Sequence, residues 1–260
     1  MLSAEMRGSV LHLTLDRPEV RNAFNDELIS QLTIAFTHLD PAVRAVVLAG
    51  NGPAFCGGGD LNWMRKAAAY TEDQNYEDAL KLAQLFQAIV SCPALVIARV
   101  HGPAFGGGCG LVAAADVGVA STEAKFSFSE VKLGLIPATI SPFVVDKIGR
   151  GHARALFTTG EAFGPDKALR IGLVHEVVAP NELDTAVAAK VKAVLSGGPS
   201  AVATSKRLAT ESPLPIEESA RRLARARASE EGREGVAAFL EKRRAAFVED
   251  LPLDYTGVQA

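Results

Sequence analysis

The stretch ARVHGPAFGGGCGL, residues 98–111, decides how this chain folds. An apolar run, ALVIA at residues 94–98, leads into it, and a run of small residues, LVAAA at residues 111–115, follows it. This order predicts a strand, a tight glycine loop and a buried helix. The glycines at residues 106–108 have no Cβ, so the backbone can turn sharply there and approach a ligand closely. The alternative is a glycine turn that serves only to pack the strand against the helix.

A second version of this pattern lies upstream, GPAFCGGGDL at residues 52–61. It follows a continuous apolar run at residues 43–49, which is typical of a strand buried on both faces. The first amides of each following helix have no partner within the helix and lie at its positive dipole end. Two such loops can converge on one oxygen atom, which is the arrangement of an oxyanion hole. The internal similarity also predicts stacked supersecondary repeats.

The composition is that of a globular protein, with 260 residues of which 48% are hydrophobic and 22% are charged. This length suits one large domain, or a domain with an appendage. The net charge of −3 gives no reason to expect nucleic acid or a membrane surface as a partner. The three cysteines form no CxxC pair, and the chain shows neither a leader peptide nor an apolar run of about 18 residues. We therefore expect a cytoplasmic protein in a reducing compartment, without a membrane span.

Hydrophobic periodicity predicts the elements around the two loops. Strands are expected at residues 10–15, 43–49, 117–120, 124–128 and 174–178. Helices are expected at residues 26–39, 76–90, 143–148, 151–158, 165–171 and 181–195. The polar stretch at residues 64–76 is expected to be mobile.

The sequence SGGP at residues 196–199 is the strongest boundary signal in the chain. It divides the chain into an α/β core, residues 1–196, and a helical region, residues 197–260. Within the helical region, helices are expected at residues 200–210, 215–229 and 234–247.

The helical region contains a basic run, RRLARAR at residues 221–227. Glu217 and Glu218 lie four residues before Arg221 and Arg222, the order that favours ion pairs on a helix surface. We therefore interpret the run as a solvated helix face rather than a nucleic-acid site.

Three segments, GPAFCGGGDL, HGPAFGGGCGL and FSFSEVKLGLIPATISP, resemble in order and separation those of the enoyl-CoA hydratase/isomerase family, the crotonases. The resemblance extends from the opening DRPEVRNAFN to the C-terminal FLEKRRAAF. It implies an α/β fold, a spiral of ββα repeats with a C-terminal α-helical trimerisation region. The segment SEVKLGLIPATISP is most similar to that of family members that act on glutaconyl-type thioesters, such as methylglutaconyl-CoA hydratase.

The resemblance also implies an oligomer, either a homotrimer or a homohexamer. The predicted C-terminal helices carry large apolar side chains. Three helices alone would leave these side chains exposed to solvent, which indicates an interface. These side chains are Leu208, Leu223, Phe239, Leu240 and Phe247.

Carried over by position, the oxyanion amides are those of Gly59 and Gly107, and the acid/base is Glu130. The residues implied to bind the acyl-CoA substrate are Arg21, Ala23, Ala54, Gly57, Gly58, Asp60, Leu61, Phe239 and Lys242. The last two would come from the C-terminal helix of the same or a neighbouring subunit. Coenzyme A enters as part of the substrate, and no separate cofactor is expected. The five histidines show no metal-ligand spacing, so no metal is expected.

The residues around Glu130 agree with this role. Its neighbours Phe128 and Val131 are apolar and should exclude water from the carboxylate. Exclusion of water raises the pKa of a carboxyl group, which suits proton transfer near neutral pH. The alternative for a lone glutamate in a loop is a surface charge or a helix cap.

The chain departs from the family at Gly110, where many hydratases carry a second glutamate directly after GGGC. The leading interpretation is a hydro-lyase that adds water to a 2-enoyl-CoA, with a glutaconyl-type substrate supplying the second carboxylate itself. Crotonyl-CoA would then be hydrated poorly, and Gly110→Glu would raise that activity if the new side chain fits. One alternative is a Δ3,Δ2-enoyl-CoA isomerase, which needs a single base. Another is a non-catalytic acyl-CoA- or RNA-binding protein that kept the fold.

Overall fold

The computed structural model describes residues 1–211 and 213–252. Residue 212 and residues 253–260, which belong to the predicted helical region, lie outside the described residues.

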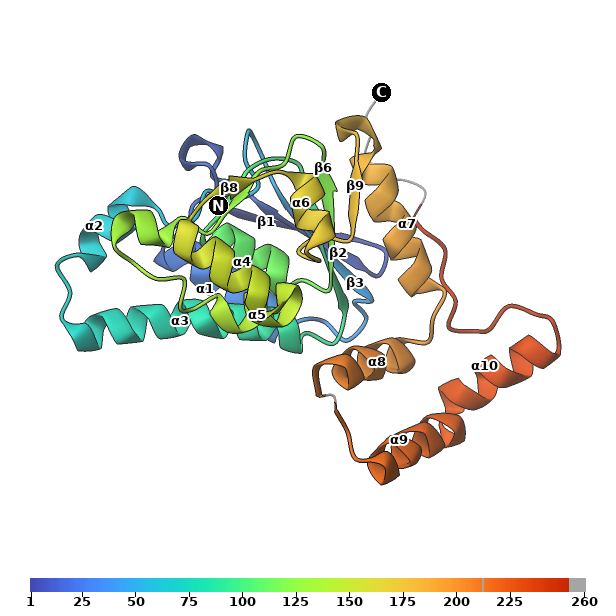
Figure 1. The fold of residues 1–260 in the computed structure, drawn as a ribbon. Coiled ribbons are helices and arrows are strands. Elements are labelled where there is room, and N and C mark those ends of the chain that lie inside the picture. The colour runs from blue at the N-terminus through green and yellow to red at the C-terminus, as the bar shows by residue number, and fades with distance from the viewer. Residues whose placement is uncertain (212, 253–260) are drawn as a thin grey trace.

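A six-stranded sheet forms the centre of the α/β core (Figure 1). Strands β1 and β2 form an antiparallel hairpin, and all other neighbouring strands are parallel. Strand β3 is buried over almost its whole length, as its continuous apolar sequence predicted. In spatial order the strands are β1 (Leu2–Arg7), β2 (Val10–Leu15), β3 (Ala45–Gly50), β4 (Leu95–Val100), β6 (Val117–Ser121) and β9 (Glu176–Val178).

Helices cover both faces of this sheet (Figure 1). Side chains alternate along β3, so Val46 points into the larger apolar core and Val47 into the smaller one on the opposite face. The smaller core is closed by α7 (Leu183–Leu195). The helices over the larger core are α1 (Asp26–Thr37), α3 (Glu72–Ser91), α4 (Gly107–Ala114) and α5 (Ser141–Thr159).

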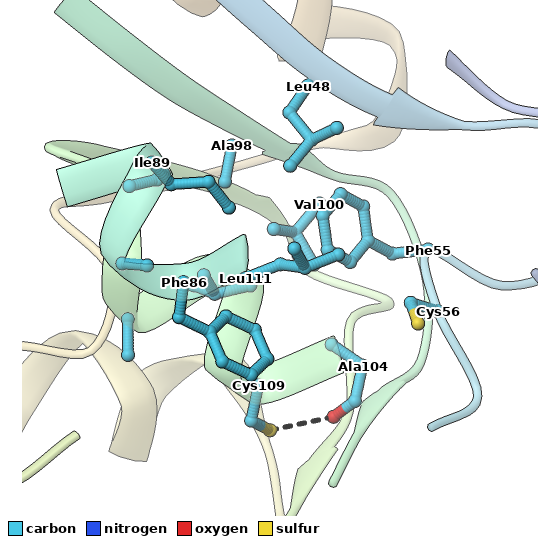
Figure 2. Packing of buried hydrophobic residues seen from close by; sticks show 14 of the residues in the cluster. Leu48, Phe55, Cys56, Phe86, Ile89, Ala98, Val100, Ala104, Cys109 and Leu111 are labelled. Carbon is cyan, nitrogen blue, oxygen red and sulfur yellow. Dashed lines mark hydrogen bonds between the residues drawn. The ribbon is translucent and has the colours of Figure 1, made fainter. Parts of the chain in front are cut away.

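A second sheet of three short strands supports the loops that follow β4 and β6. Figure 2 shows the apolar packing behind these loops, where Phe55 of the first glycine loop, Val100 of β4 and Leu111 of α4 belong to one cluster. The Cys109 thiol donates to the Ala104 carbonyl oxygen at 2.9 Å, which fixes the start of α4 against the small sheet. The remaining elements here are β5 (Ala104–Phe105), β7 (Phe126–Ser127), β8 (Ala162–Phe163), α6 (Pro165–Arg170) and the 3₁₀ helices η1 (Pro18–Val20), η2 (Glu130–Leu133) and η3 (Pro180–Glu182).

The predicted helix start at residue 76 is wrong. The polar stretch at residues 64–76 contains most of α2 (Leu61–Ala67) and the first turn of α3. Thr71 caps α3 through its hydroxyl, which accepts from the Gln74 amide, while the Gln74 side chain accepts from the Thr71 amide. These first turns are polar and exposed, so they carry no apolar period. Strand β1, which the sequence did not predict, is likewise mostly exposed.

Helix α5 contains both predicted helices, 143–148 and 151–158, joined at Gly149. Gly149 has a φ of 76°, a conformation that favours glycine and kinks the helix at this residue.

The C-terminal helices are α8 (Pro199–Glu211), α9 (Ile216–Ala228) and α10 (Glu230–Leu240). The predicted bounds of the last helix, 234–247, are wrong. Ser229 caps its start by accepting from the Gly232 amide at 3.0 Å, and Lys242 turns into the left-handed region just after its end. Phe247, which was expected to be exposed, is instead half-buried beside Gly235. Of the two predicted helix-surface pairs on α9, the one between Arg222 and Glu218 is present, with Arg222 Nε 3.1 Å from Glu218 Oε1. Arg221 lies 3.9 Å from Glu218 instead of pairing with Glu217.

Two cations tie the C-terminal helices to the core. Arg44 is buried and donates to the carbonyl oxygens of Gly197 and Phe247. Lys206 of α8 pairs with Asp116 at 2.8 Å. The division into two regions at residue 196 stays a prediction. In the described part of the chain, no helix has the length and apolar character needed to cross a membrane.

Candidate active site

The two glycine loops lie side by side, as their sequence similarity predicted. The Cys56 amide of the first loop donates to the Pro103 carbonyl oxygen of the second at 3.1 Å. The Phe105 amide donates back to the Cys56 carbonyl oxygen at 2.9 Å. This exchange of bonds pairs the loops as in a short parallel ladder.

The loops also approach each other closely at Gly58 and Gly106. A Cβ on Gly58 would lie 3.0 Å from the Phe105 carbonyl oxygen and 4.0 Å from the Gly106 Cα. Gly58 also has a φ of 95°, which only glycine adopts without strain. Close backbone approach therefore requires glycine here whether or not a ligand is bound.

The amides of Gly59 and Gly107 are free donors within residues 1–211 and 213–252. On either side of Gly59, the Gly58 carbonyl oxygen and the Asp60 amide bond to the backbone of Phe24, at 2.7 and 2.9 Å. The Gly59 amide therefore points away from that pairing. Gly107 is the first residue of α4, where a helix leaves its amide unpaired at the positive end of its dipole.

Glu130 begins η2 and places its carboxylate against the second glycine loop. A Cβ on Gly106 would lie 3.1 Å from Glu130 Oε1, so the glycine leaves room for the carboxylate. The other oxygen, Oε2, is buried and has no hydrogen-bond partner in the described part of the protein. Burial raises the pKa of Glu130 above its ordinary value, and a hydrogen bond to its own backbone lowers it by less. Glu130 is therefore not a plain surface charge.

Gly110 has no space for a side chain. A Cβ there would lie 2.4 Å from Ile140 Cγ2 and 2.8 Å from Phe86 Cζ. Phe86 also contacts the Phe143 ring, so the position is closed by an apolar cluster. Gly110→Glu was expected to raise the hydration of crotonyl-CoA only if the new side chain fits. A glutamate does not fit here without displacing this cluster, so that condition is not met. Gly110 therefore adds no second carboxylate beside that of Glu130.

Arg21 and Ala23 lie beside the first glycine loop, which itself carries the predicted substrate-binding residues Ala54, Gly57, Gly58, Asp60 and Leu61. The Gly57 amide donates to the Arg21 carbonyl oxygen at 2.8 Å, and the Arg21 side chain is exposed. Ala23 is buried, and its carbonyl oxygen accepts from Arg17. Leu61 is 74% exposed beside the loop, at the start of α2.

Asp60 is engaged within the protein. Its carboxylate pairs with Arg17 at 2.9 Å and accepts from the amides of Asn62 and Trp63 as the cap of α2. Burial acts to raise the pKa of Asp60, but these hydrogen bonds outweigh it and hold the pKa below its ordinary value. The Asp60 side chain therefore shapes the loop.

Phe239 and Lys242 do not join the other site residues within this chain. Phe239 lies in the last turn of α10 and Lys242 just beyond its end. The main contacts of α10 are with α8 and α9, away from the glycine loops (Figure 1). Phe239 is 82% exposed.

Sequence reasoning missed three residues beside the site. Asn22 is fully buried and its side chain holds the first glycine loop. Trp63 and Met64 of α2 flank Gly59, where a Cβ would lie 3.4 Å from Met64 Sδ and 3.5 Å from Trp63 Cε3. The available signals were an asparagine in a polar loop and two large apolar residues in a polar helix, and neither indicates a site by itself.

Comparison with known proteins agrees with the fold. AtuE of Pseudomonas aeruginosa superposes with a TM-score of 0.92 and 34% identity, over 95% of this chain and 99% of that one. An enoyl-CoA hydratase of Shewanella pealeana superposes with a TM-score of 0.90 and 38% identity, over 94% and 95%. The predicted crotonase-like α/β fold is therefore confirmed.

The sequence itself matches the model of the enoyl-CoA hydratase/isomerase family over residues 5–250. A crotonyl-CoA hydratase of Syntrophomonas wolfei is 34% identical over 95% of this chain and 97% of its own length. A short-chain-enoyl-CoA hydratase of Clostridium acetobutylicum is 30% identical over 92% and 94%. The chain belongs to the enoyl-CoA hydratase/isomerase family, and it is an enzyme of that family.

Proposed function

We propose that this protein is a hydro-lyase that adds water across the 2,3-double bond of an enoyl-CoA thioester. Its family and the hydratase names of its relatives support this reaction class. The observation that carries the proposal is the Glu130 carboxylate. It borders the meeting point of the two glycine loops, and one of its oxygens is buried without a partner in the described residues.

In this proposal the amides of Gly59 and Gly107 donate to the thioester oxygen as the acyl group becomes enolate-like. Their lack of protein acceptors in the described residues supports this role. The position of Gly107 at the start of α4 adds the positive end of a helix dipole. Removing one such donor typically costs about 10²–10³ in kcat.

Glu130 then moves the protons. As a base it takes a proton from the water that attacks C3, and as an acid it delivers a proton to C2. Its raised pKa supports this double use, because the protonated form persists closer to neutral pH than in an exposed glutamate.

Coenzyme A would lie along the first glycine loop as part of the substrate, with no separate cofactor and no metal. The proposed contacts from this chain are Arg21, Ala23, Ala54, Gly57, Gly58, Asp60 and Leu61. Phe239 and Lys242 would come from a neighbouring copy in a homotrimer or homohexamer, because α10 of the same chain packs against α8 and α9. We expect the enzyme to act in the cytoplasm.

A glutaconyl-type acyl group is the finer form of the proposal. It rests on the sequence of residues 129–142, SEVKLGLIPATISP, and on the absence of a side chain at Gly110. A carboxylate carried by the substrate would take the part of the second glutamate in holding the water.

The second candidate is a Δ3,Δ2-enoyl-CoA isomerase. The observation that favours it is the apolar filling of the space beside Gly110 by Phe86 and Ile140. Moving a proton between C2 and C4 needs one base, and Glu130 can supply it.

Three thioesters separate these reactions: crotonyl-CoA, a 3-enoyl-CoA and glutaconyl-CoA. A hydratase adds the mass of one water to a 2-enoyl substrate and removes its conjugated absorbance. An isomerase creates conjugated absorbance from the 3-enoyl substrate without a change of mass. Fast hydration of crotonyl-CoA would refute the substrate-carboxylate idea. No turnover of any thioester, with CoA still bound in calorimetry, would favour the non-catalytic alternative.

A further inference from the structure

Asn22 is a fully buried polar residue in an unusual conformation. Its φ is 56°, in the left-handed region, which asparagine tolerates better than most residues but which still carries strain. Strain of this kind persists only where the surroundings hold it in place. The Arg17 amide donates to Asn22 Oδ1 at 2.8 Å, and the Asn22 amide donates to the Arg17 carbonyl oxygen at 2.8 Å.

The side-chain amide of Asn22 reaches into the first glycine loop. Its nitrogen donates to the carbonyl oxygens of Asn51 and Ala54, both at 2.8 Å, and approaches that of Phe55 at 3.3 Å. A Cβ on Gly50 would lie 2.9 Å from this nitrogen, so the glycine leaves the room it needs. These carbonyl groups are buried or partly buried, and an unmet acceptor in such a place is costly.

The neighbours of Asn22 in the sequence make further hydrogen bonds along the loop, on both sides of Gly59. Arg21 accepts from the Gly57 amide at 2.8 Å, and Phe24 exchanges bonds with Gly58 and Asp60. Arg21 and Asn22 both have a left-handed backbone, with φ of 55° and 56°, in the turn that carries these bonds. The first loop also carries the pairing with the second loop through Cys56. The Asn22 side chain thus anchors the glycine loop that carries the Gly59 amide.

We propose that Asn22 is a positioning residue that holds the Gly59 amide at the distance and direction needed to share one thioester oxygen with the Gly107 amide. This rests on the proposed function, because it assumes that both amides bind that oxygen. Asn22 acts through the loop backbone and does not touch the substrate. Small displacements of such donors matter, since a misplacement of about 1 Å can cost about 10² in rate.

The test uses Asn22→Gly in the full-length protein. Glycine adopts a φ of about 56° without strain, so the turn is kept and only the side-chain bonds are lost. The matched control is Asn25→Ala in the same polar loop. Asn25 caps α1 by accepting from the Leu28 amide at 2.9 Å, so its loss weakens folding without releasing the glycine loop.

The readout is the absorption band of a bound dienoyl-CoA. Hydrogen bonds to the thioester oxygen polarise the conjugated system and move its band to longer wavelength. We expect a clear shift with wild type and with Asn25→Ala, a much smaller one with Asn22→Gly, and a loss of about 10–100-fold in kcat in Asn22→Gly. The band is measured with the ligand at saturation, because Asn22 lies between the proposed CoA contacts Arg21 and Ala23 and bonds to the Ala54 carbonyl oxygen, so a weaker Kd for CoA is also expected.

Thermal unfolding of each variant, measured alongside, ensures that the assays report on folded protein. A full band shift and a kcat within about twofold of wild type in Asn22→Gly would overturn the positioning role. An equal loss of band shift in Asn25→Ala would also overturn it, since any weakening of this loop would then have the same effect. No band shift with wild type would instead overturn the proposed binding of the thioester oxygen by the two amides.

Discussion

At the scale of single residues, the site combines a partly buried carboxylate with two amides that have no acceptor among the described residues. Glu130 has an oxygen that is buried and unpaired in the described residues, which is costly for an ionised group. Such an arrangement destabilises the folded protein, and proteins keep it where the group is used. This cost can be measured independently of activity.

We predict that Glu130→Gln stabilises the protein at neutral pH. The pKa of Glu130 is raised in the folded state, so folding favours the protonated form. The ionised form therefore costs stability once pH rises through the folded-state pKa, and this cost is absent below the ordinary value of 4.5. The melting temperature of Glu130→Gln should exceed that of wild type at pH 7–8, and the gap should close toward about pH 4.

The control is Glu19→Gln, which makes the same chemical change at an exposed position and should not raise the melting temperature as Glu130→Gln does. A Glu130→Gln protein that melts at or below the wild-type temperature at every pH would contradict a buried, unsatisfied carboxylate.

The sequence predicted part of this residue-scale picture. The two similar glycine loops indicated that their amides converge, and apolar neighbours indicated a raised pKa for Glu130. The side chains that close the space beside Gly110 come from α3 and from the segment before α5, far apart in the sequence. The left-handed turn at Asn22 has no sequence signal, because asparagine occurs in many loops.

At the scale of elements, α4 is a helix whose glycines serve packing as well as the site. A Cβ on Gly107 would lie 2.8 Å from the Phe24 ring, and one on Gly110 would meet Phe86 and Ile140. Phe24 and Phe86 themselves pack edge to face. Aromatic side chains thus pack directly against the backbone of α4.

We predict that Gly110→Ala destabilises the protein by about 1–3 kcal/mol, the usual cost of overpacking a core. The gain in helix propensity, about 1 kcal/mol, is too small to offset the contact with Ile140. The matched control is Gly151→Ala in α5, where a Cβ meets nothing within 4 Å. That substitution should be neutral or stabilise by up to about 1 kcal/mol. Urea unfolding of both variants measures the difference, and equal stability of the two would contradict the packing described for α4.

Element boundaries were predicted well where a buried apolar period was present and poorly where it was not. Strand β3 and the loop-to-helix segment into α4 followed from apolar runs and glycines. The start of α3 depends on the cap at Thr71, and the end of α10 depends on the backbone turn at Lys242. Caps and single left-handed residues shift a helix end without changing the apolar pattern.

At the scale of the whole molecule, the C-terminal helices extend from the core (Figure 1). Apolar side chains on these helices are exposed. Leu223 of α9 and Leu240 of α10 are 53% and 73% exposed. Light scattering should therefore find a trimer or a hexamer at micromolar concentration. Leu240→Asp should weaken that association, because a charge would be buried in the interface. A wild-type protein that stays monomeric under these conditions would contradict the predicted assembly.

Glu130 is proposed to move the proton in a reaction of a CoA thioester. The most direct measurement is the steady-state turnover of the preferred thioester by wild type and Glu130→Gln, with CoA binding to both followed by calorimetry. The amide keeps the shape of the side chain but cannot relay a proton, so turnover should fall by about 10²–10⁴ while the Kd for CoA stays nearly unchanged. Turnover in Glu130→Gln equal to that of wild type would contradict the account.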